Sequence, residues 1–337
     1  MYQQNFAVML NANARKVNSR VRGKIEQLVA PEDIYYSHSE DESKDIVAEI
    51  ADRGYPTVFT GGGDGTLCQF LNDYADVRRP TSFAAEAPNI GVLHLGTGNA
   101  VASIVSSSNY ACDLQSYMDR RSTDFHKMWL VQAEGKRFPF GGLGLDAEIL
   151  NDYMFLKQNY ASNRMLKPLL QNLGGYFAAL ATRTIPRATK RLIQRKHNPD
   201  VRITNMGSEA YMLHGGQAVK AFAPGEVMYE GPSNITMFGT CPYYGHGFTV
   251  MPHAMTRPGF FQLRTVTMGI PRVLANLPKI WKGTYEGDGI FDWHAQHVKL
   301  DFSEKVPYQY GGDAMGYRDS VEVKTEAAEV VNLVRFI

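Results

Sequence analysis

The chain of 337 residues is too long for one ordinary hydrophobic core, so two domains are expected. Hydrophobic residues make up 44% and charged residues 20%, and the net charge of +1 excludes nucleic-acid binding through bulk charge. The three cysteines have no spacing typical of a metal site or a disulfide framework, which favours a reducing compartment. No signal peptide is evident and no apolar run reaches the ~18 residues of a membrane span, so we expect a cytoplasmic protein, at most peripheral to a membrane.

The first part of the chain alternates predicted strands and helices. Residues 6–10 are apolar throughout, as in a central parallel strand, and a polar turn at 11–15 leads into a helix. The order β-α-β-α-β implies a parallel sheet covered by helices on both faces. The expected strands are 6–10, 34–36, 57–60 and 89–95, and the expected helices are 17–28, 43–53, 66–74 and 101–105, with a linker at 77–88.

A glycine-rich turn, Thr60-Gly61-Gly62-Gly63-Asp64-Gly65-Thr66, lies between the third strand and its helix. Glycines allow a sharp turn and close approach of an anion, and the start of a helix favours phosphate. A carboxylate beside phosphate would repel it. Asp64, for which no structural partner is apparent, therefore indicates either an intervening Mg²⁺ ion or a base that accepts a proton from a hydroxyl. The alternative is a glycine turn with a capping Asp and no ligand.

A second glycine turn, Gly96-Thr97-Gly98-Asn99-Ala100, follows the next buried strand in the same architectural position. Ligands of open α/β sheets bind at the carboxyl ends of the strands, so two such turns in one sheet imply one shared site. Asn11, in the polar turn after the first strand, is a further candidate contact. Its alternative role is to cap the helix that follows.

From about residue 125 the pattern changes to short strands joined by turns rich in Gly, Pro and Asn, as in an antiparallel sandwich. A mostly helical insertion is expected at 150–196. The predicted domains are an α/β domain at 1–124, a β-sandwich at 125–319, and a C-terminal strand at 320–337 that returns to the first domain. The expected strands are 128–133, 137–140, 201–204, 210–213, 233–238, 248–251, 260–266, 298–302, 308–310 and 320–324.

Five elements, in order along nearly the whole chain, resemble the diacylglycerol kinase, sphingosine kinase and ceramide kinase family of lipid kinases. Any one of these motifs is weak, but five in order are specific. NAD kinases and phosphofructokinases share only the first glycine motif. The matching segments are 11–14, 62–66 (Gly-Gly-Asp-Gly-Thr), 95–99 (Leu-Gly-Thr-Gly-Asn), 142–147 (Gly-x-Gly-x-Asp-Ala), and 243–247 with 252–254.

The resemblance implies a Rossmann-like first domain of the NAD kinase and diacylglycerol kinase type, and ATP-dependent phosphorylation of a lipid hydroxyl. Phosphoryl transfer needs an in-line hydroxyl, neutralised phosphate oxygens and a base. The resemblance implies Asp64 as the base and Asp313 as the group that positions Mg²⁺ or the nucleotide, so both are candidate catalytic residues and metal ligands. The expected ATP contacts are Asn11, Ser37, Gly62, Gly63, Gly65, Thr66, Gly96, Thr97, Gly98, Asn99 and Gly312.

Several positions depart from the family pattern. Ala12 replaces the usual proline, Gln69 replaces a Glu, and Ala100 replaces the Asp of many bacterial members. The segment 257–262 lacks the Asp residues that hold a structural Mg²⁺ in bacterial diacylglycerol kinases, so that metal site is expected to be absent. The family's Asp-Gly-Glu appears as Gly-Gly-Asp at 311–313, without the first carboxylate.

Asp146 and Glu148 lie two residues apart on an expected strand, where the resemblance to sphingosine kinases places the lipid headgroup. Such a carboxylate pair would bind an amine or a hydroxyl, although solvated charges on a surface strand are the alternative. With Ala100 and the missing metal segment, the pair favours a sphingoid base or ceramide as acceptor. The other functions left open are a diacylglycerol kinase and a catalytically impaired pseudo-kinase that binds nucleotide or lipid.

The insertion carries a second signal, because the segment 157–196 is basic, contains no Asp or Glu, and has leucines and aromatics among its cations. This composition favours docking on an anionic membrane. Nucleic-acid binding would explain the charges but not the leucines. A helical pair packed on its own sandwich is the remaining alternative.

Overall fold

The computed structural model describes residues 6–79, 83–119, 124–160, 179, 182–183, 186, 198–245 and 247–336. The basic segment predicted at 157–196 lies almost entirely outside the described residues. The chain forms two compact units, which interleave in sequence. The first comprises Met1–Pro139, Thr240–Gly259 and Thr325–Ile337, and the second comprises Phe140–Gly239 and Phe260–Lys324. The segment Thr240–Gly259 thus belongs to the first unit, although the predicted domains place it in the second.

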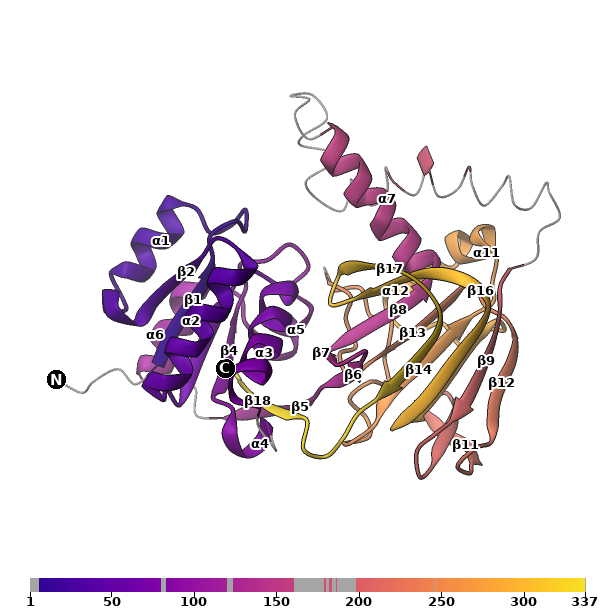
Figure 1. The fold of residues 1–337 in the computed structure, drawn as a ribbon. Coiled ribbons are helices and arrows are strands. Elements are labelled where there is room, and N and C mark those ends of the chain that lie inside the picture. Colours follow the sequence, from indigo (N-terminus) through magenta and orange to yellow (C-terminus); the bar gives the residue numbers. More distant parts are fainter. Residues whose placement is uncertain are drawn as a thin grey trace. The chain divides into compact units, whose positions relative to one another are not determined.

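The first unit is an α/β fold built on one sheet. The strand order is β2-β1-β3-β4-β18-β5, parallel from β2 to β18, with β5 antiparallel at one edge. Helices lie on both sides of this sheet (Figure 1). Its elements are β1 (Phe6–Asn11), α1 (Ser19–Glu26), η1 (Pro31–Asp33), β2 (Ile34–Ser37), α2 (Glu40–Arg53), β3 (Thr57–Gly61), α3 (Asp64–Arg78), α4 (Phe83–Glu86), β4 (Asn89–Leu93), α5 (Ala100–Ile104), α6 (Tyr110–Met118), β5 (Phe125–Trp129), β6 (Val131–Ala133), β7 (Lys136–Phe138) and β18 (Val330–Val334).

Buried aromatic side chains fix α6 on this sheet. Tyr117 packs edge-to-face on Phe6 and Phe59, with ring centroids 5.5 and 5.0 Å apart. The Tyr117 hydroxyl also donates to Thr57 Oγ1 at 2.7 Å. Aromatic pairs of this geometry stabilise a fold beyond the area that they bury. Phe6 and Thr57 are the first residues of β1 and β3, so these contacts fix α6 at the amino ends of the two strands.

The second unit is an antiparallel sheet, which confirms the predicted fold class. Its strands run in the order β11-β10-β15-β14-β13-β8-β16-β17, and β9 pairs with both β16 and β12. The elements are β8 (Phe140–Gly144), α7 (Leu145–Tyr160), β9 (Asp200–Asn205), β10 (Ala210–His214), β11 (Gln217–Phe222), β12 (Val227–Pro232), β13 (Ile235–Gly239), β14 (Phe261–Val266), α11 (Ile270–Ala275), α12 (Leu277–Trp281), β15 (Ile290–Ala295), β16 (His297–Tyr310) and β17 (Asp313–Lys324).

Some predicted elements are wrong in type or extent. Residues 248–251 form no strand beyond an isolated bridge between Tyr243 and Thr249. The expected linker at 77–88 contains the end of α3 and the short helix α4. The strands β11, β12 and β15 were not predicted, and β16 was predicted as two strands. Its pairing with β17 shifts register between Asp301 and Val306, which hides the alternation of a single strand.

Gln69, which departs from the family pattern, has a structural role in the first unit. Its Nε2 atom donates to Asp73 Oδ1 at 2.7 Å, and Ser43 Oγ of α2 donates to Asp73 Oδ2 at 2.6 Å. Burial raises the pKa of Asp73, while the hydrogen bonds from Ser43 and Gln69 oppose that rise. A carboxylate at position 69 would place a second negative charge where Asp73 now has a donor.

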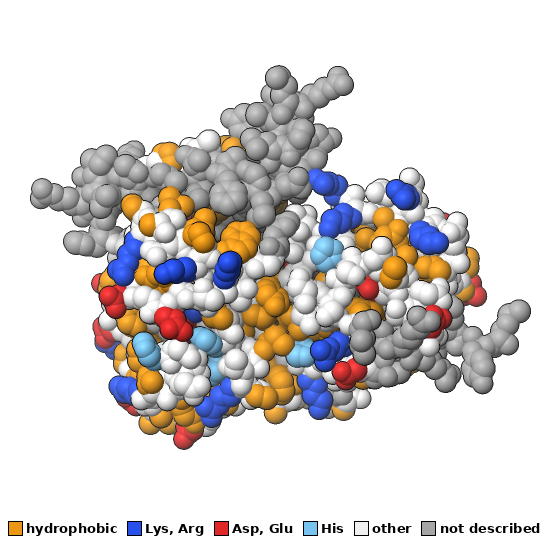
Figure 2. All heavy atoms as spheres, turned by 180° about the vertical axis from the view of Figure 1, so that it is seen from behind, with side chains coloured by type: hydrophobic (Ala, Val, Ile, Leu, Met, Phe, Trp, Pro, Cys, Tyr) orange, Lys and Arg blue, Asp and Glu red, His pale blue; other side chains and the backbone are white. Residues whose placement is uncertain are grey.

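Among the described residues, no helix combines the length and the apolar character that crossing a bilayer would require. Side chains of both charges are interspersed over the face drawn in Figure 2, in keeping with the net charge of +1.

We predict that Gln69→Glu lowers the free energy of unfolding by ~1–3 kcal/mol at neutral pH, because Asp73 would lose a donor and face a like charge. Like charges raise both pKa values in the folded state, so the loss is largest at neutral pH and shrinks as the pH falls towards ~4. Urea unfolding at neutral pH and at a pH of ~4 measures this loss of stability. Gln69→Ala removes the donor without adding charge and should lose less, with a weaker pH dependence. Equal stability of Gln69→Glu and the wild type at pH 7 would contradict this account.

Candidate active site

The two glycine turns meet at the carboxyl ends of β3 and β4. Their backbones approach so closely that a Cβ built on Gly96 would lie 2.3 Å from the Cα of Gly63. Gly63 also has a φ of 112°, a conformation that favours glycine. A Cβ on Gly62 would lie 2.2 Å from Thr66 Oγ1. Side chains are therefore excluded here, and the turns form one cradle lined by backbone.

Asp64 is the first residue of α3, and its carboxylate crosses to the second turn. Oδ2 accepts the N–H of Ala100 and Oδ1 accepts the N–H of Val101, each at 3.0 Å. Asp64 thus caps the start of α5, where a negative charge is favoured. Burial raises the pKa of Asp64, and the N–H groups of Val101 and Ala100 oppose the rise. The structural partner that the sequence did not reveal is the backbone of the second turn.

Asn11, Ser37 and Thr66 lie at the same edge of the sheet. Asn11 Nδ2 donates to Thr66 Oγ1 at 3.4 Å, which joins the turn after β1 to the first glycine turn. Asn11 and Ser37 are register partners in β1 and β2, and the N–H of Ala12 donates to the Ser37 carbonyl at 2.9 Å. The structure therefore brings Asn11 and Thr66 together beside Gly62, and Ser37 lies next to Asn11 on the neighbouring strand.

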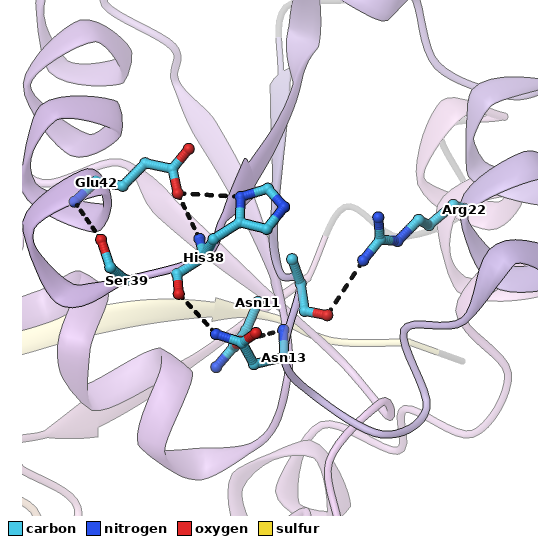
Figure 3. A network of polar contacts seen from close by, with 7 residues as sticks. Asn11, Asn13, Arg22, His38, Ser39 and Glu42 are labelled. Carbon is cyan, nitrogen blue, oxygen red and sulfur yellow. Dashed lines mark hydrogen bonds and ion pairs between the residues drawn. The ribbon is translucent and has the colours of Figure 1, made fainter.

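Hydrogen bonds hold the turn at Ala12 without the family's proline (Figure 3). Asn11 Oδ1 accepts the N–H of Asn13 at 2.9 Å, and Asn13 Nδ2 donates to the His38 carbonyl at 2.7 Å. Arg22 Nη2 reaches back from α1 to donate to the Ala12 carbonyl at 3.1 Å. Neither Asn13 nor Arg22 was predicted to support this turn. The only available signal was the repeated Asn, since Asn side chains often stabilise turns.

The same network continues into the start of α2 (Figure 3). Glu42 Oε2 accepts the His38 N–H at 2.6 Å, and the Glu42 N–H donates to Ser39 Oγ at 3.2 Å. This arrangement resembles a capping box, in which a Ser and a Glu three residues later satisfy free donors at a helix start. The His38 N–H is the main cause that lowers the pKa of Glu42. The loop after β2 is thereby fixed beside the turn after β1.

Asn99 closes the second turn on itself. Its Oδ1 accepts the Gly96 N–H and its Nδ2 donates to the Gly96 carbonyl, both at 2.7 Å. Asn99 is buried and has a φ of 54°, which Asn tolerates better than most residues. Thr97 is exposed on the same turn. The predicted contact of Asn99 with a nucleotide stays a prediction, and its observed role is to shape the turn.

The segment 240–259 also reaches this site within the first unit. A Cβ built on Gly245 would lie 2.7 Å from the Cα of Gly98, so position 245 needs glycine for close backbone contact. Gly245 has a φ of 101° and accepts the Phe248 N–H at 2.9 Å in a tight turn. The motif that the sequence analysis identified at 243–247 therefore supports the second glycine turn. His246 lies outside the described residues.

The described residues contain no group of three or more His, Cys, Asp or Glu side chains that could hold a metal ion. Mg²⁺ in nucleotide sites is usually held by one or two carboxylates together with phosphate oxygens and water. The cradle fits the phosphates of ATP, because it excludes side chains and presents the start of α3. Mg²⁺ would fit here only together with those phosphates, with Asp64 as the nearby carboxylate.

The expectation that Asp146 and Glu148 share a strand face is wrong, because both lie in the first turn of α7. The chain leaves β8 at Gly144, whose φ of 99° allows the abrupt change, and is helical from Leu145. Helical residues two apart do not face each other. Glu148 is buried, whereas Asp146 is partly exposed.

Gln309 is a candidate site residue that the sequence analysis missed. Its Nε2 atom donates to Asp146 Oδ2 at 3.1 Å, and its Oε1 atom accepts the Gly312 N–H at 3.3 Å. Gly311 and Gly312 have φ values of 57° and 89° and turn the chain from β16 to β17, where exposed Asp313 follows. Within the second unit, Gln309 thus joins the candidate substrate carboxylate to the turn before Asp313. A glutamine in a buried Tyr-Gln-Tyr strand was the only sequence signal.

Comparisons with known proteins agree with this geometry. Residues 6–128 match the model of the diacylglycerol kinase catalytic domain. A diacylglycerol kinase from Bacillus anthracis str. Sterne has a similar structure, with a TM-score of 0.66 and 16% identity over 98% of this chain and 96% of that chain. Two further structures from that organism, provisionally assigned as diacylglycerol kinases, have TM-scores of 0.65 at 16% and 15% identity, over 98% of this chain and 97% of theirs. No curated protein matches the sequence.

At such identities the structural likeness shows the fold alone. Residues 6–128 thus match a diacylglycerol kinase catalytic domain, and the whole chain is similar in fold to the structures of diacylglycerol kinases.

Proposed function

We propose that this protein is an ATP-dependent kinase that phosphorylates a lipid hydroxyl. The observation that carries the proposal is the junction of the two glycine turns through Asp64, inside a domain that matches the diacylglycerol kinase catalytic domain. A backbone-lined cradle at the start of α3 suits the phosphates of ATP. Mg²⁺, when bound, would neutralise the phosphate oxygens. Asp64 would accept the proton of the attacking hydroxyl, and Asp313 would position the metal or the nucleotide.

The proposed acceptor is a sphingoid base or ceramide. Ala100 in place of Asp and the Asp-free segment at 257–262 support this choice against diacylglycerol. Asp146 supports it further, because this residue is partly exposed and Gln309 holds its carboxylate in place. Glu148 no longer contributes, since it is buried and does not face Asp146. The basic composition of 157–196 supports attachment of the enzyme to an anionic membrane.

Gly96→Ala should weaken ATP binding by roughly tenfold to a hundredfold, because its Cβ would meet the Gly63 backbone and force the turns apart at a cost of ~1–3 kcal/mol. Isothermal titration with an ATP analogue measures this. Gly23→Ala in α1 is the matched control, since a Cβ there has nothing within 4 Å, and it should bind ATP as the wild type does. Unchanged affinity of Gly96→Ala would show that ATP does not use this cradle.

Asp64→Asn should lower turnover by ~10²–10⁴-fold, the usual cost of losing a general base. It should also lower stability, since an amide cannot accept both N–H groups of Ala100 and Val101. The two roles are separable by measuring ATP affinity, turnover and the melting temperature together. A base role predicts that turnover falls far more than affinity. A parallel fall of ATP affinity, turnover and melting temperature would show that Asp64 only holds the two turns together. Full activity of Asp64→Asn would remove Asp64 from the mechanism.

Turnover of sphingosine, ceramide and diacylglycerol in mixed micelles tests the acceptor. An ionised Asp146 should favour an amine-bearing headgroup by tenfold to a hundredfold, the equivalent of a charge-assisted hydrogen bond of ~1.5–3 kcal/mol. Asp146→Asn should remove that preference and leave ATP affinity unchanged. If diacylglycerol is the best substrate and Asp146→Asn changes nothing, the protein is a diacylglycerol kinase. ATP binding without transfer to any acceptor would indicate the impaired pseudo-kinase.

A further inference from the structure

The connection between β14 and β15 is an ordered segment that buries almost nothing. It runs from Thr267 to Gly289 and contains α11 and α12, and we call it the α11–α12 excursion (Figure 1). From Pro271 to Asp288, all of which the structure describes, no residue is buried. Leu274 is 43% exposed. Val273, Leu277, Ile280 and Trp281 are only partly covered.

Hydrogen bonds attach both ends of the excursion to the sheet of the second unit. The Thr267 N–H donates to the Gly289 carbonyl at 2.9 Å. Asn234 Nδ2 donates to the carbonyls of Thr267 and Met268 at 3.1 and 2.8 Å, and the Met268 side chain is buried. The excursion therefore leaves the sheet from a fixed base.

Between its two ends, the excursion is ordered by hydrogen bonds within its own backbone. The N–H groups of Arg272 and Val273 donate to the Gly269 carbonyl, and the Asn276 N–H donates to the Arg272 carbonyl. The Ile280 N–H donates to the Asn276 carbonyl at 3.0 Å. Ordering a segment costs conformational entropy, which is normally offset by burying apolar side chains. Here the apolar side chains are ordered without being buried. Exposed apolar surface of this kind is typical of a site that binds a membrane or another molecule.

The charges of the excursion indicate which kind of partner binds this surface. Between Thr267 and Tyr285 the sequence has three cations, Arg272, Lys279 and Lys282, and no acid. All three are exposed. The acids Glu286 and Asp288 follow at the returning turn, and Asp288 approaches Arg272 only at 4.0 Å with its own side chain fully exposed. A pair so exposed contributes little, so Arg272 stays available to another anion.

We propose that the α11–α12 excursion docks on the anionic surface of a phospholipid bilayer. Leu, Ile and Trp side chains beside Lys and Arg are the composition of helices that lie in a membrane interface. Lysine stems extend along apolar surface while their ammonium groups reach phosphate, so Lys279 and Lys282 suit this position. The proposal rests on the proposed function in one respect, since a lipid kinase must reach an acceptor within a bilayer. It adds a docking element among described residues, apart from the basic segment 157–196.

Vesicle sedimentation tests the charges, with phosphatidylcholine vesicles that contain or lack phosphatidylserine. The triple variant Arg272→Gln, Lys279→Gln, Lys282→Gln should bind the phosphatidylserine vesicles about a hundredfold more weakly than the wild type, from ~1 kcal/mol for each cation. The matched control is Lys220→Gln, Lys299→Gln, Lys305→Gln, which removes the same charge from exposed positions on the sheet of the same unit. It should stay within about threefold of the wild type. Equal losses in the two variants, or no loss in the first, would overturn the proposal.

Fluorescence tests whether the apolar side chains enter the bilayer. Trp281 is the partly exposed tryptophan of the excursion, whereas Trp293 is fully buried in the sheet. Brominated lipids should quench the emission of wild-type protein on phosphatidylserine vesicles. Trp281→Phe should bind equally and lose most of that quenching. Binding of the wild type without any quenching that depends on Trp281 would also overturn the proposal.

Turnover of a short-chain acceptor dissolved as monomers separates this proposal from the proposed function. The charge variant should phosphorylate it at the wild-type rate. Vesicle binding that depends on the excursion, with no phosphorylation by the wild type, would reject the kinase and leave the docking element standing. Phosphorylation with no vesicle binding would reject the docking element and leave the kinase standing.

Discussion

The bond between the Asp64 carboxylate and the N–H groups of Ala100 and Val101 is the constraint on which the candidate site depends. A buried carboxylate is costly unless hydrogen bonds satisfy it. Each charge-assisted bond contributes ~1.5–3 kcal/mol, and both exist only if the two glycine turns touch. That contact in turn requires glycine at positions 63 and 96. One charged side chain therefore turns two separate strand-to-helix turns into a single preorganised cradle.

Three departures from the family pattern have a local structural explanation. Bonds from Asn13 and Arg22 hold the turn that proline would otherwise stiffen at position 12. The amide of Gln69 donates to Asp73, whereas a Glu there would repel it. Gly311 lies at a φ of 57° in the turn between β16 and β17, where glycine carries no steric cost. Each of these three replacements is therefore accommodated by its local surroundings.

The sequence was informative wherever chemistry and topology gave the same answer. Glycine turns after buried strands predicted the cradle, because parallel strands end at one edge of a sheet. The partner of Asp64 was not predictable, since a backbone N–H leaves no trace in sequence. The strand expected at Asp146 failed because Gly144 allows an immediate change to helix, and period two over so few residues does not exclude a helix start. The place of 240–259 in the first unit depends on long-range contact, which local pattern does not encode.

In the second unit, as in the first, one buried side chain forms hydrogen bonds to two separate segments of the chain. Gln309 is buried in β16, and its amide has one partner in α7 and another in the turn before β17. A glutamine can do this because it carries a donor and an acceptor on one rigid plane. Asp146 and the turn before Asp313 are therefore held together before any substrate arrives. In each unit a buried side chain already joins two polar segments of the chain. Substrate binding then has less chain to order, and more of its energy remains for orienting the reacting groups.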